Sequence, residues 1–537
     1  MYLDLSDKKI LVIDDFSQMR SSMKKMVQSF GATDVDDAAN GEDAVKKIAR
    51  KPYDIVLCDY SLGEGKDGQQ VLEESKHRNL VKYSTIFMMI TAETSTEMVM
   101  GAVEYYPDDY LTKPFTKEVL GKRLEKLIER KSDFDDIESA IHKKQLERAI
   151  ALCDEHIGKM PKNLLEFFRL KTDLCLKTGA YEQAEAVYEK VLAMRAIPWA
   201  VMGMAKVHFH QQQYQKAQEM LRDLLETNDA HVEAYDWLAK CYDKLGEHQQ
   251  AQEALARAAE LSPKSVLRQK ALGEIAHKNH DLDAAEKSYS KAIRLGKNSI
   301  YKSPHDYANL SKVFVEKDSP SQALKVLGNL QKEYKGDANA GILCHAMEGM
   351  AYKKMNRNEE ADQAMEAASA LYEKAGGKVP LEVTMDVAQA HLTLGNKEKG
   401  NAMIKEIVRN HHDDEEILKQ IEGIFEDADL EEEGKRIISS TRDEIIGINN
   451  KGVTLVKEKK LKEAIDFFDK AADGLPDNKI INMNAAQAII MQMEQDGSGD
   501  KLLYQARQYL DRVQRLEPAN MEYQKLAKRY KTLITAK

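Results

Sequence analysis

Small residues recur at a nearly constant interval through most of this 537-residue chain. The recurring residue is alanine, and successive copies lie 33 to 38 residues apart: Ala149, Ala184, Ala217, Ala251, Ala285, Ala323 and Ala361. A bulky residue often follows four positions later, as Tyr188 follows Ala184. A repeat of this length predicts stacked helix pairs, because one pair cannot bury its apolar face without its neighbours. Most of the chain should therefore fold as a continuous stack of helices.

This pattern resembles the tetratricopeptide repeat (TPR), in which two antiparallel helices occupy about 34 residues and a small residue lies at their crossing. The resemblance implies an all-α TPR superhelical solenoid over residues 131–537. We predict about ten units, the weaker ones centred on Gly400, Ala464 and Ala506. Residues 413–443 fit helices but diverge from the repeat, and an amphipathic helix over residues 521–534 would cap the stack.

The first 130 residues follow a different pattern. Short apolar runs rich in β-branched residues predict buried strands at residues 9–14, 34–38, 54–59, 85–91 and 109–112. Helical patterns alternate with them over residues 18–30, 41–50, 67–78, 95–103 and 117–129. Such alternation predicts a five-stranded parallel sheet with helices on both faces. We place the domain boundary in the charged segment that follows residue 129.

Polar side chains stand where these strands end. Asp14 and Asp15 end the first run, Asp59 ends the third, and Thr91 ends the fourth. Lys113 comes directly after the last strand. Because the carboxyl ends of parallel strands meet at one edge of a sheet, these side chains can share a single crevice. Three carboxylates suit Mg²⁺, and the metal and the lysine would together offset the charge of a phosphoryl group at Asp59.

This set of residues resembles the CheY-like receiver domain of bacterial response regulators, over roughly the first quarter of the chain. The resemblance implies a flavodoxin-like sheet with the strand order 2-1-3-4-5. It implies that Asp59 is the phosphoacceptor and that Lys113 contacts the phosphoryl group. Asp14, Asp15, Asp59 and the main-chain carbonyl of Ser61 would hold the Mg²⁺ ion.

Two further residues match the switch of that family, Thr91 and the aromatic Tyr110. The resemblance implies that both move inward on phosphorylation, a local charge change with a wider structural effect. We expect this change to reach the solenoid through the helix over residues 117–129. The Lys113–Pro114 bond is expected to be cis. The loop after Asp59 departs from the family pattern, because it has Gly63 where proline is usual and is about one residue longer.

Composition narrows the range of partners. The formal net charge of −10 argues against nonspecific nucleic-acid binding. Five scattered cysteines without a C-x-x-C pair indicate reduced thiols and a cytoplasmic protein. We predict no membrane insertion, because no stretch approaches the roughly 20 apolar residues that a spanning helix needs.

The solenoid has a candidate peptide site on the first helices of its units. Lys206, Lys240 and Lys312 occupy the same place in three units, and Trp199 and Phe209 lie on the same wall. A basic row beside aromatic side chains would suit an acidic peptide with an apolar anchor. The alternative is that these lysines are ordinary solvated residues, since isolated surface charges contribute little.

Taken together, the sequence predicts a response regulator of a phosphorelay. A sensor histidine kinase or a phosphotransfer protein would phosphorylate Asp59, and the TPR region would act by binding another protein. Pairing of two receivers into a homodimer is a further expectation. We predict no enzymatic activity beyond the receiver's own phosphotransfer and slow dephosphorylation. Two alternatives stay open: a constitutive TPR scaffold whose receiver merely accepts phosphate, and a transcription regulator, which would need a recognition helix that the sequence does not display.

Overall fold

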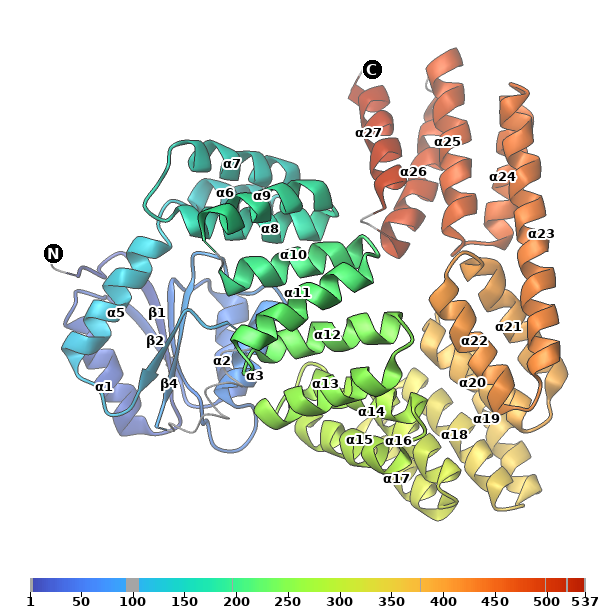
Figure 1. Ribbon diagram of the computed structural model, residues 1–537, viewed down its shortest axis with the longest axis horizontal. Helices are drawn as coiled ribbons and strands as arrows, with labels where there is room; N and C mark the ends of the chain where they lie inside the picture. Colours follow the sequence, from blue (N-terminus) through green and yellow to red (C-terminus); the bar gives the residue numbers. More distant parts are fainter. Residues whose placement is uncertain are drawn as a thin grey trace. The chain divides into compact units, whose positions relative to one another are not determined.

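The computed structural model describes residues 3–92, 106–195, 197–376, 378–497, 499–517 and 520–535. It forms two compact units, Met1–Asp306 and Tyr307–Lys537 (Figure 1). The helix predicted over residues 95–103 lies outside the described residues. Among the helices that are described, none is long and apolar enough to cross a membrane.

The chain begins with a parallel sheet of five strands in the order β2-β1-β3-β4-β5, as predicted. The strands are β1 (Lys9–Ile13), β2 (Asp34–Ala38), β3 (Ile55–Asp59), β4 (Ile86–Thr91) and β5 (Asp109–Thr112). In this register Asp59 pairs with Ile90, and Thr91 pairs with Thr112. The last residues of the three strands β3, β4 and β5 therefore lie side by side at one edge.

Helices cover both faces of this sheet. They are α1 (Ser17–Gln28), α2 (Gly41–Arg50), α3 (Gly68–His77) and α5 (Lys117–Arg130). Apolar side chains of α2 and α3 pack on one face, and those of α1 and α5 pack on the other. Helix starts follow from local chemistry, because the Asn40 side chain caps α2 and Asp67 forms a capping box with Gln70 on α3. The result is an α/β domain whose helix α5 ends at Arg130.

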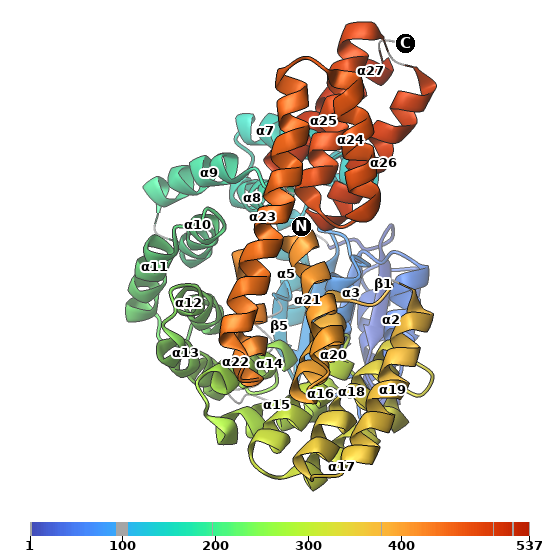
Figure 2. The same cartoon turned by 90° about the vertical axis from the view of Figure 1, so that its right-hand side faces the viewer.

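The rest of the first unit is a solenoid of paired helices. Its helices are α6 (Asp135–His142), α7 (Leu146–Gly158), α8 (Leu164–Thr178), α9 (Tyr181–Met194), α10 (Pro198–His210), α11 (Tyr214–Thr227), α12 (Val232–Lys244), α13 (His248–Leu261), α14 (Val266–Lys278) and α15 (Leu282–Gly296). Figure 2 shows α7 to α15 following one another around an arc. The alanines that mark the repeat lie on the second helix of each pair and are at most 1% exposed. This confirms the predicted TPR-like fold.

Close crossings between neighbouring helices explain why small residues recur. A Cβ atom at Gly203 of α10 would overlap the ring of Tyr188 on α9. At Gly273 of α14 it would lie 2.9 Å from the ring of Tyr289 on α15. In these two units the bulky residue four positions after the alanine thus packs against a glycine of a neighbouring helix. The pattern in the sequence reports this interlocking of large and small side chains.

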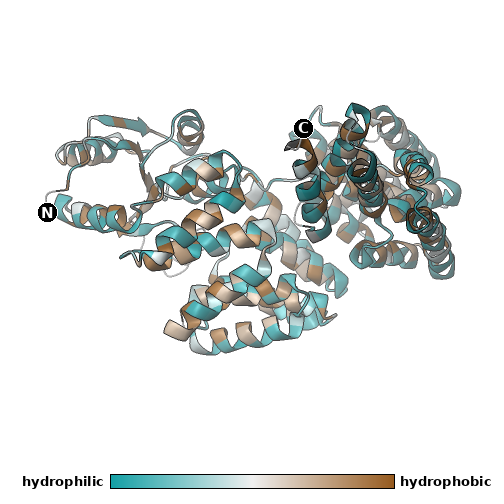
Figure 3. Ribbon diagram, turned by 90° about the horizontal axis from the view of Figure 1, so that it is seen from above, coloured by the Kyte–Doolittle hydropathy of each residue, from teal (hydrophilic) through white to brown (hydrophobic). Residues whose placement is uncertain are grey.

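The second unit continues the helical pairs. Helix α16 (Pro304–Glu316) contains the division between the units. It is followed by α17 (Pro320–Glu333), α18 (Ala338–Lys354), α19 (Asn358–Ala375), α20 (Leu381–Thr393), α21 (Lys397–His411), α22 (Glu415–Asp427), α23 (Glu431–Lys457), α24 (Leu461–Gly474), α25 (Lys479–Asp496), α26 (Asp500–Leu516) and α27 (Met521–Thr535). Figure 3 shows hydrophobic and hydrophilic residues mixed along these helices, as amphipathic packing requires.

Residues 413–443, which we expected to diverge, also form a closely packed helix pair. Gly434 on α23 lies 34 residues after Gly400, and a Cβ there would overlap Phe425 of α22. Further along the same helix, Gly452 accommodates the ring of Phe468 on α24. The 27-residue helix α23 therefore serves two successive pairs, without the break between helices that separates the other pairs.

Candidate functional site

Three carboxylates converge where strands β1 and β3 end. Oxygen atoms of Asp14, Asp15 and Asp59 lie within 4.8 Å of one another. The Asp14 side chain is fully buried and Asp59 is 7% exposed, whereas Asp15 is exposed. The main-chain N–H of Phe16 donates to Asp14 Oδ1 at 2.8 Å and fixes that carboxylate. Hard oxygen donors at such separations fit Mg²⁺, so the residues match the metal predicted from the sequence.

The Lys113 ammonium lies between two of these carboxylates. Its Nζ donates to Asp14 Oδ2 and to Asp59 Oδ2, both at 2.8 Å. Burial alone would lower the pKa of Lys113, but the two carboxylates outweigh it and raise that pKa. Burial raises the pKa of Asp59, although Lys113 opposes the rise. The Lys113–Pro114 bond is cis, as the sequence led us to expect. A cation is thus in place beside the carboxylate that would accept the phosphoryl group.

The two residues predicted to form the switch lie on neighbouring strands. Thr91 ends β4 and is 5% exposed. Tyr110 lies on β5, and its ring packs on the face of the sheet that α2 and α3 cover. The buried Tyr110 hydroxyl has no hydrogen-bond partner among the described residues, and burial raises its pKa. That Thr91 and Tyr110 move on phosphorylation stays a prediction.

The loop between Asp59 and α3 folds back against the site. Gly68 N–H donates to the Tyr60 carbonyl at 2.8 Å, and a Cβ at Gly68 would overlap the Asp59 carbonyl oxygen. A Cβ at Gly63, which has a φ of 71°, would lie 3.3 Å from Asp15 Oδ2. Ser61 is exposed within this loop. That its main-chain carbonyl binds the metal stays a prediction. Two glycines of this loop therefore lie close to Asp15 and Asp59 of the acidic site.

The lysines predicted to form a basic row have carboxylate or aromatic neighbours. Lys206 Nζ donates to Glu233 Oε1 at 2.5 Å. Lys312, which belongs to the second unit, donates to Asp386 Oδ1 at 2.5 Å. Lys240 Nζ lies 4.1 Å from the centroid of the Trp237 ring. These contacts leave less uncompensated positive charge for an acidic peptide than the sequence suggested.

An aromatic cluster occupies the same wall. Trp199 contacts Tyr188 edge-on with ring centroids 6.1 Å apart, and Phe209 contacts Trp237 at 5.3 Å. Trp237 is not among the residues predicted from the sequence, although an aromatic residue three positions before Lys240 on one helix face is a usable signal. Trp237 helps to line a cavity of about 430 Å³ between α12 and α14. Its other lining residues include Lys240, Leu267, Arg268 and Glu274.

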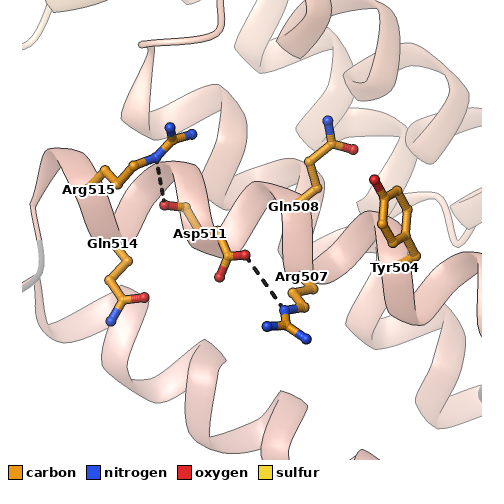
Figure 4. Close-up of a pocket in the computed structure, with 6 residues that line it drawn as sticks. All are labelled: Tyr504, Arg507, Gln508, Asp511, Gln514 and Arg515. Atoms are coloured by element: carbon orange, nitrogen blue, oxygen red, sulfur yellow. Dashed lines mark hydrogen bonds and ion pairs between the residues drawn. The ribbon is translucent and has the colours of Figure 1, made fainter. Parts of the chain in front are cut away.

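A second hollow lies along α26 (Figure 4). Its lining side chains all come from that helix: Tyr504, Arg507, Gln508, Asp511, Gln514 and Arg515. Arg507 pairs with the Asp511 carboxylate at 3.7 Å, and Arg515 Nε donates to the Asp511 carbonyl at 3.3 Å. Figure 4 shows these side chains spread along the helix instead of converging on one point. We assign no ligand to this surface.

Comparison with known families agrees with both halves of this description. A model for the response regulator receiver domain matches residues 10–125. Tetratricopeptide repeat models match residues 242–300 and 344–374. A model described as anaphase-promoting complex, cyclosome, subunit 3 matches residues 177–258.

Curated relatives match the N-terminal domain. Chemotaxis protein CheY-3 of Vibrio cholerae is 31% identical over 122 residues, which are 23% of this chain and 92% of the relative. Chemotaxis protein CheY of Pseudomonas aeruginosa is 30% identical over 122 residues, covering 23% of this chain and 97% of that protein. Residues 10–125 are thus a response regulator receiver domain. The chain belongs to the CheY-like receiver family and carries TPR repeats after that domain.

Solved structures similar to parts of the chain include the receiver domain of the Francisella response regulator 1452. It is 29% identical, covers 23% of this chain and 98% of that one, and has a TM-score of 0.21. A crystal structure of MamA is 21% identical, covers 32% of this chain and 95% of that one, and has a TM-score of 0.28.

Proposed function

We propose that the protein is a response regulator of a phosphorelay. A sensor histidine kinase or a phosphotransfer protein donates a phosphoryl group to Asp59, and the solenoid delivers the output by binding another protein. Phosphoryl transfer to Asp59 is supported by the position of Lys113. Its ammonium contacts Asp14 and Asp59, two members of the cluster of three carboxylates.

The transfer step follows from these positions. A carboxylate oxygen of Asp59 forms a bond to phosphorus while the bond from phosphorus to the donor's histidine nitrogen breaks, and the electron pair stays on that nitrogen. The product is an acyl phosphate on Asp59. The Lys113 ammonium offsets the negative charge that collects on the transferring oxygens. Asp14, Asp15, Asp59 and the Ser61 carbonyl would hold Mg²⁺, which supplies further charge compensation.

Thr91 extends this site along the edge of the sheet. In our proposal its hydroxyl, at the end of β4, contacts the phosphoryl oxygens once the group is on Asp59. Tyr110, one strand over, then changes its packing. Strand β4, which carries Thr91, pairs with β3, and strand β5, which carries Tyr110, pairs with β4. A charge added at Asp59 is therefore close to both strands.

The output side of the proposal rests on the repeats. Stacked helix pairs offer extended concave surfaces that suit protein partners. In the cavity beside Trp237, aromatic and charged side chains come together. We propose no nucleic-acid partner, because a net charge of −10 opposes binding to phosphates. We also propose no catalysis beyond the receiver's own phosphotransfer and dephosphorylation.

Labelling with acetyl phosphate, a small phosphoryl donor, tests whether Asp59 accepts a phosphoryl group. Asp59→Asn should abolish labelling, because the amide cannot form the acyl phosphate. Asp229→Asn changes an exposed aspartate of the solenoid and serves as the matched control, with labelling expected as in the wild type. Chelation of Mg²⁺ should also prevent labelling. Undiminished labelling of the Asp59→Asn protein would contradict the assignment.

The constitutive-scaffold alternative makes a different prediction about the same protein. Under it, Asp59 still takes the phosphoryl group, but the solenoid holds its partner equally in both states. Affinity capture with wild-type and Asp59→Asn protein, each treated with acetyl phosphate and Mg²⁺, separates the two. A partner that is retained equally by both would favour the scaffold.

A further inference from the structure

A segment of the solenoid contacts the loop that directly follows the phosphorylation site. The end of α15 and the residues after it, 295–301, lie against receiver residues 65–77. Asn298 Nδ2 donates to the Gly65 carbonyl at 2.8 Å. In return, Lys66 Nζ donates to the main-chain carbonyl of Asn298. We call the contact between residues 65–77 and 295–301 the clamp.

The clamp extends along one face of α3. Gln70 Nε2 donates to the Leu295 carbonyl at 3.4 Å. Ser299 Oγ donates to Glu73 Oε2 at 3.0 Å, and the Glu73 and Ser299 residues are only 4% and 6% exposed. His77 meets the Tyr301 ring edge-on at 5.3 Å. Residues three and four apart on a helix share a face, so positions 70, 73 and 77 present a single surface to the solenoid.

The opposite side of α3 packs on the sheet. Val71 and Leu72 join the core cluster that also contains Cys58, the residue before Asp59. Helix α3 is therefore held from both sides, by the receiver core and by the solenoid. Burial of a carboxylate such as Glu73 is costly unless it is hydrogen-bonded, and Ser299 of the solenoid supplies one such bond.

The clamped loop is also fixed to helices α2 and α3 of the receiver. The Lys66 main-chain N–H donates to Glu42 Oε1 at 3.0 Å, and the Lys66 ammonium pairs with Glu74 at 3.1 Å. Gly63 of the same loop faces Asp15. A second solenoid residue reaches this region, because Lys264 Nζ lies 5.1 Å from the centroid of the ring of Tyr60. One short loop thus joins the acidic site on one side and the solenoid on the other.

We propose that the clamp holds this loop in the conformation in which the phosphorylation site is assembled, with Asn298 as a positioning residue. This inference rests on the proposed function and adds a physical route between Asp59 and the solenoid. The glycine-containing loop after Asp59 is what reaches Asn298. Because coupling between two sites is reciprocal, the clamp strengthens binding of Mg²⁺ and a phosphoryl group, and their binding strengthens the clamp to the same extent.

The test uses full-length protein and beryllofluoride with Mg²⁺ as the probe of the phosphorylated state. Asn298→Ala removes the donor to Gly65, and Asn298→Asp keeps the shape but replaces the donor with an acceptor. Lys297→Ala changes the exposed neighbouring residue and is the matched control. Loss of one hydrogen bond should weaken beryllofluoride binding about two- to tenfold in both Asn298 variants. The control should bind as the wild type does.

A second readout separates positioning from general damage. In the absence of ligand, hydrogen exchange over residues 61–67 should accelerate in the Asn298 variants, while exchange in α1 and α5 stays unchanged. Unchanged or tighter beryllofluoride binding in both Asn298 variants would overturn the clamp and leave the proposed function standing. Absence of beryllofluoride binding in the wild type would overturn the proposed function itself.

Discussion

Two of the places where the receiver meets the solenoid in the first unit differ in their distance from Asp59 along the sheet. The clamp joins the loop after Asp59 to residues 295–301. The other place, which we call the linker contact, joins Tyr83 and Ser84 to the first solenoid helices. There Ser84 donates to both oxygens of Glu138, its N–H at 2.6 Å and its hydroxyl at 2.9 Å. The Tyr83 ring packs edge-on against Phe134 at 5.1 Å.

The start of the clamp, at Gly65 and Lys66, and the linker contact lie at opposite edges of the sheet. Tyr83 and Ser84 precede β4, whereas Asp59 and Thr91 end their strands. A strand of six residues spans roughly 20 Å, so the linker contact is about that far from the strand ends where Asp59 and Thr91 lie. The clamp begins six residues after Asp59 on the same edge. The difference suggests separate tasks: the linker contact anchors the receiver, and the clamp couples its site to the solenoid.

The largest expected effect comes from the linker contact. Phe134 is 1% exposed and stacks on Phe167 with ring centroids 4.4 Å apart. Phe134→Ala should cost about 3–5 kcal/mol in the stability of the first repeats, because it leaves a cavity. Urea unfolding monitored by hydrogen exchange over residues 135–178 would measure the loss. Leu165→Ala, at a 42% exposed leucine, is the control and should cost little.

The same variant also tests the division of tasks. If the linker contact only anchors, Phe134→Ala should leave the affinity for beryllofluoride and Mg²⁺ close to that of the wild type. An affinity loss as large as that of Asn298→Ala would show that both contacts couple to the site, and the comparison would fail.

A smaller effect is expected from Glu138→Ala. The Glu138 carboxylate is 5% exposed, and its removal leaves the Ser84 N–H without its acceptor. Loss of this charged acceptor should cost about 1–3 kcal/mol and accelerate exchange of the Ser84 and Thr85 amides. Glu147→Ala removes an exposed carboxylate from the next helix and is the matched control. Equal exchange in the two variants would show that the Ser84–Glu138 pair contributes nothing to anchoring.

The acidic site could be predicted from the sequence because its chemistry demands particular residues at strand ends. Asp14, Asp59 and Lys113 are far apart in the chain, but parallel strands bring their carboxyl ends together. The structure places these side chains in hydrogen-bond contact. The repeats were equally readable, because a spacing near 34 residues reports how neighbouring helices interlock.

The clamp was not predictable in this way. Lys66 and Asn298 are 232 residues apart and belong to no shared motif. Polar side chains such as Gln70 and Glu73 resemble an ordinary solvated helix face until the solenoid is seen to cover them. The sequence favoured a route through the helix over residues 117–129, since the linker follows it directly. The ion pairs of Lys206 with Glu233 and of Lys312 with Asp386 could not be predicted either. A repeat pattern specifies the fold but not which surface side chains contact one another.

Hydrogen exchange of the full-length protein with and without beryllofluoride and Mg²⁺ tests the central claim most directly. If phosphorylation is coupled to the solenoid through the clamp, ligand should slow exchange over residues 61–67 and over residues 295–301. Exchange over residues 135–142, at the linker contact, should stay the same. Slowing that is confined to the receiver, with residues 295–301 unaffected, would contradict the account.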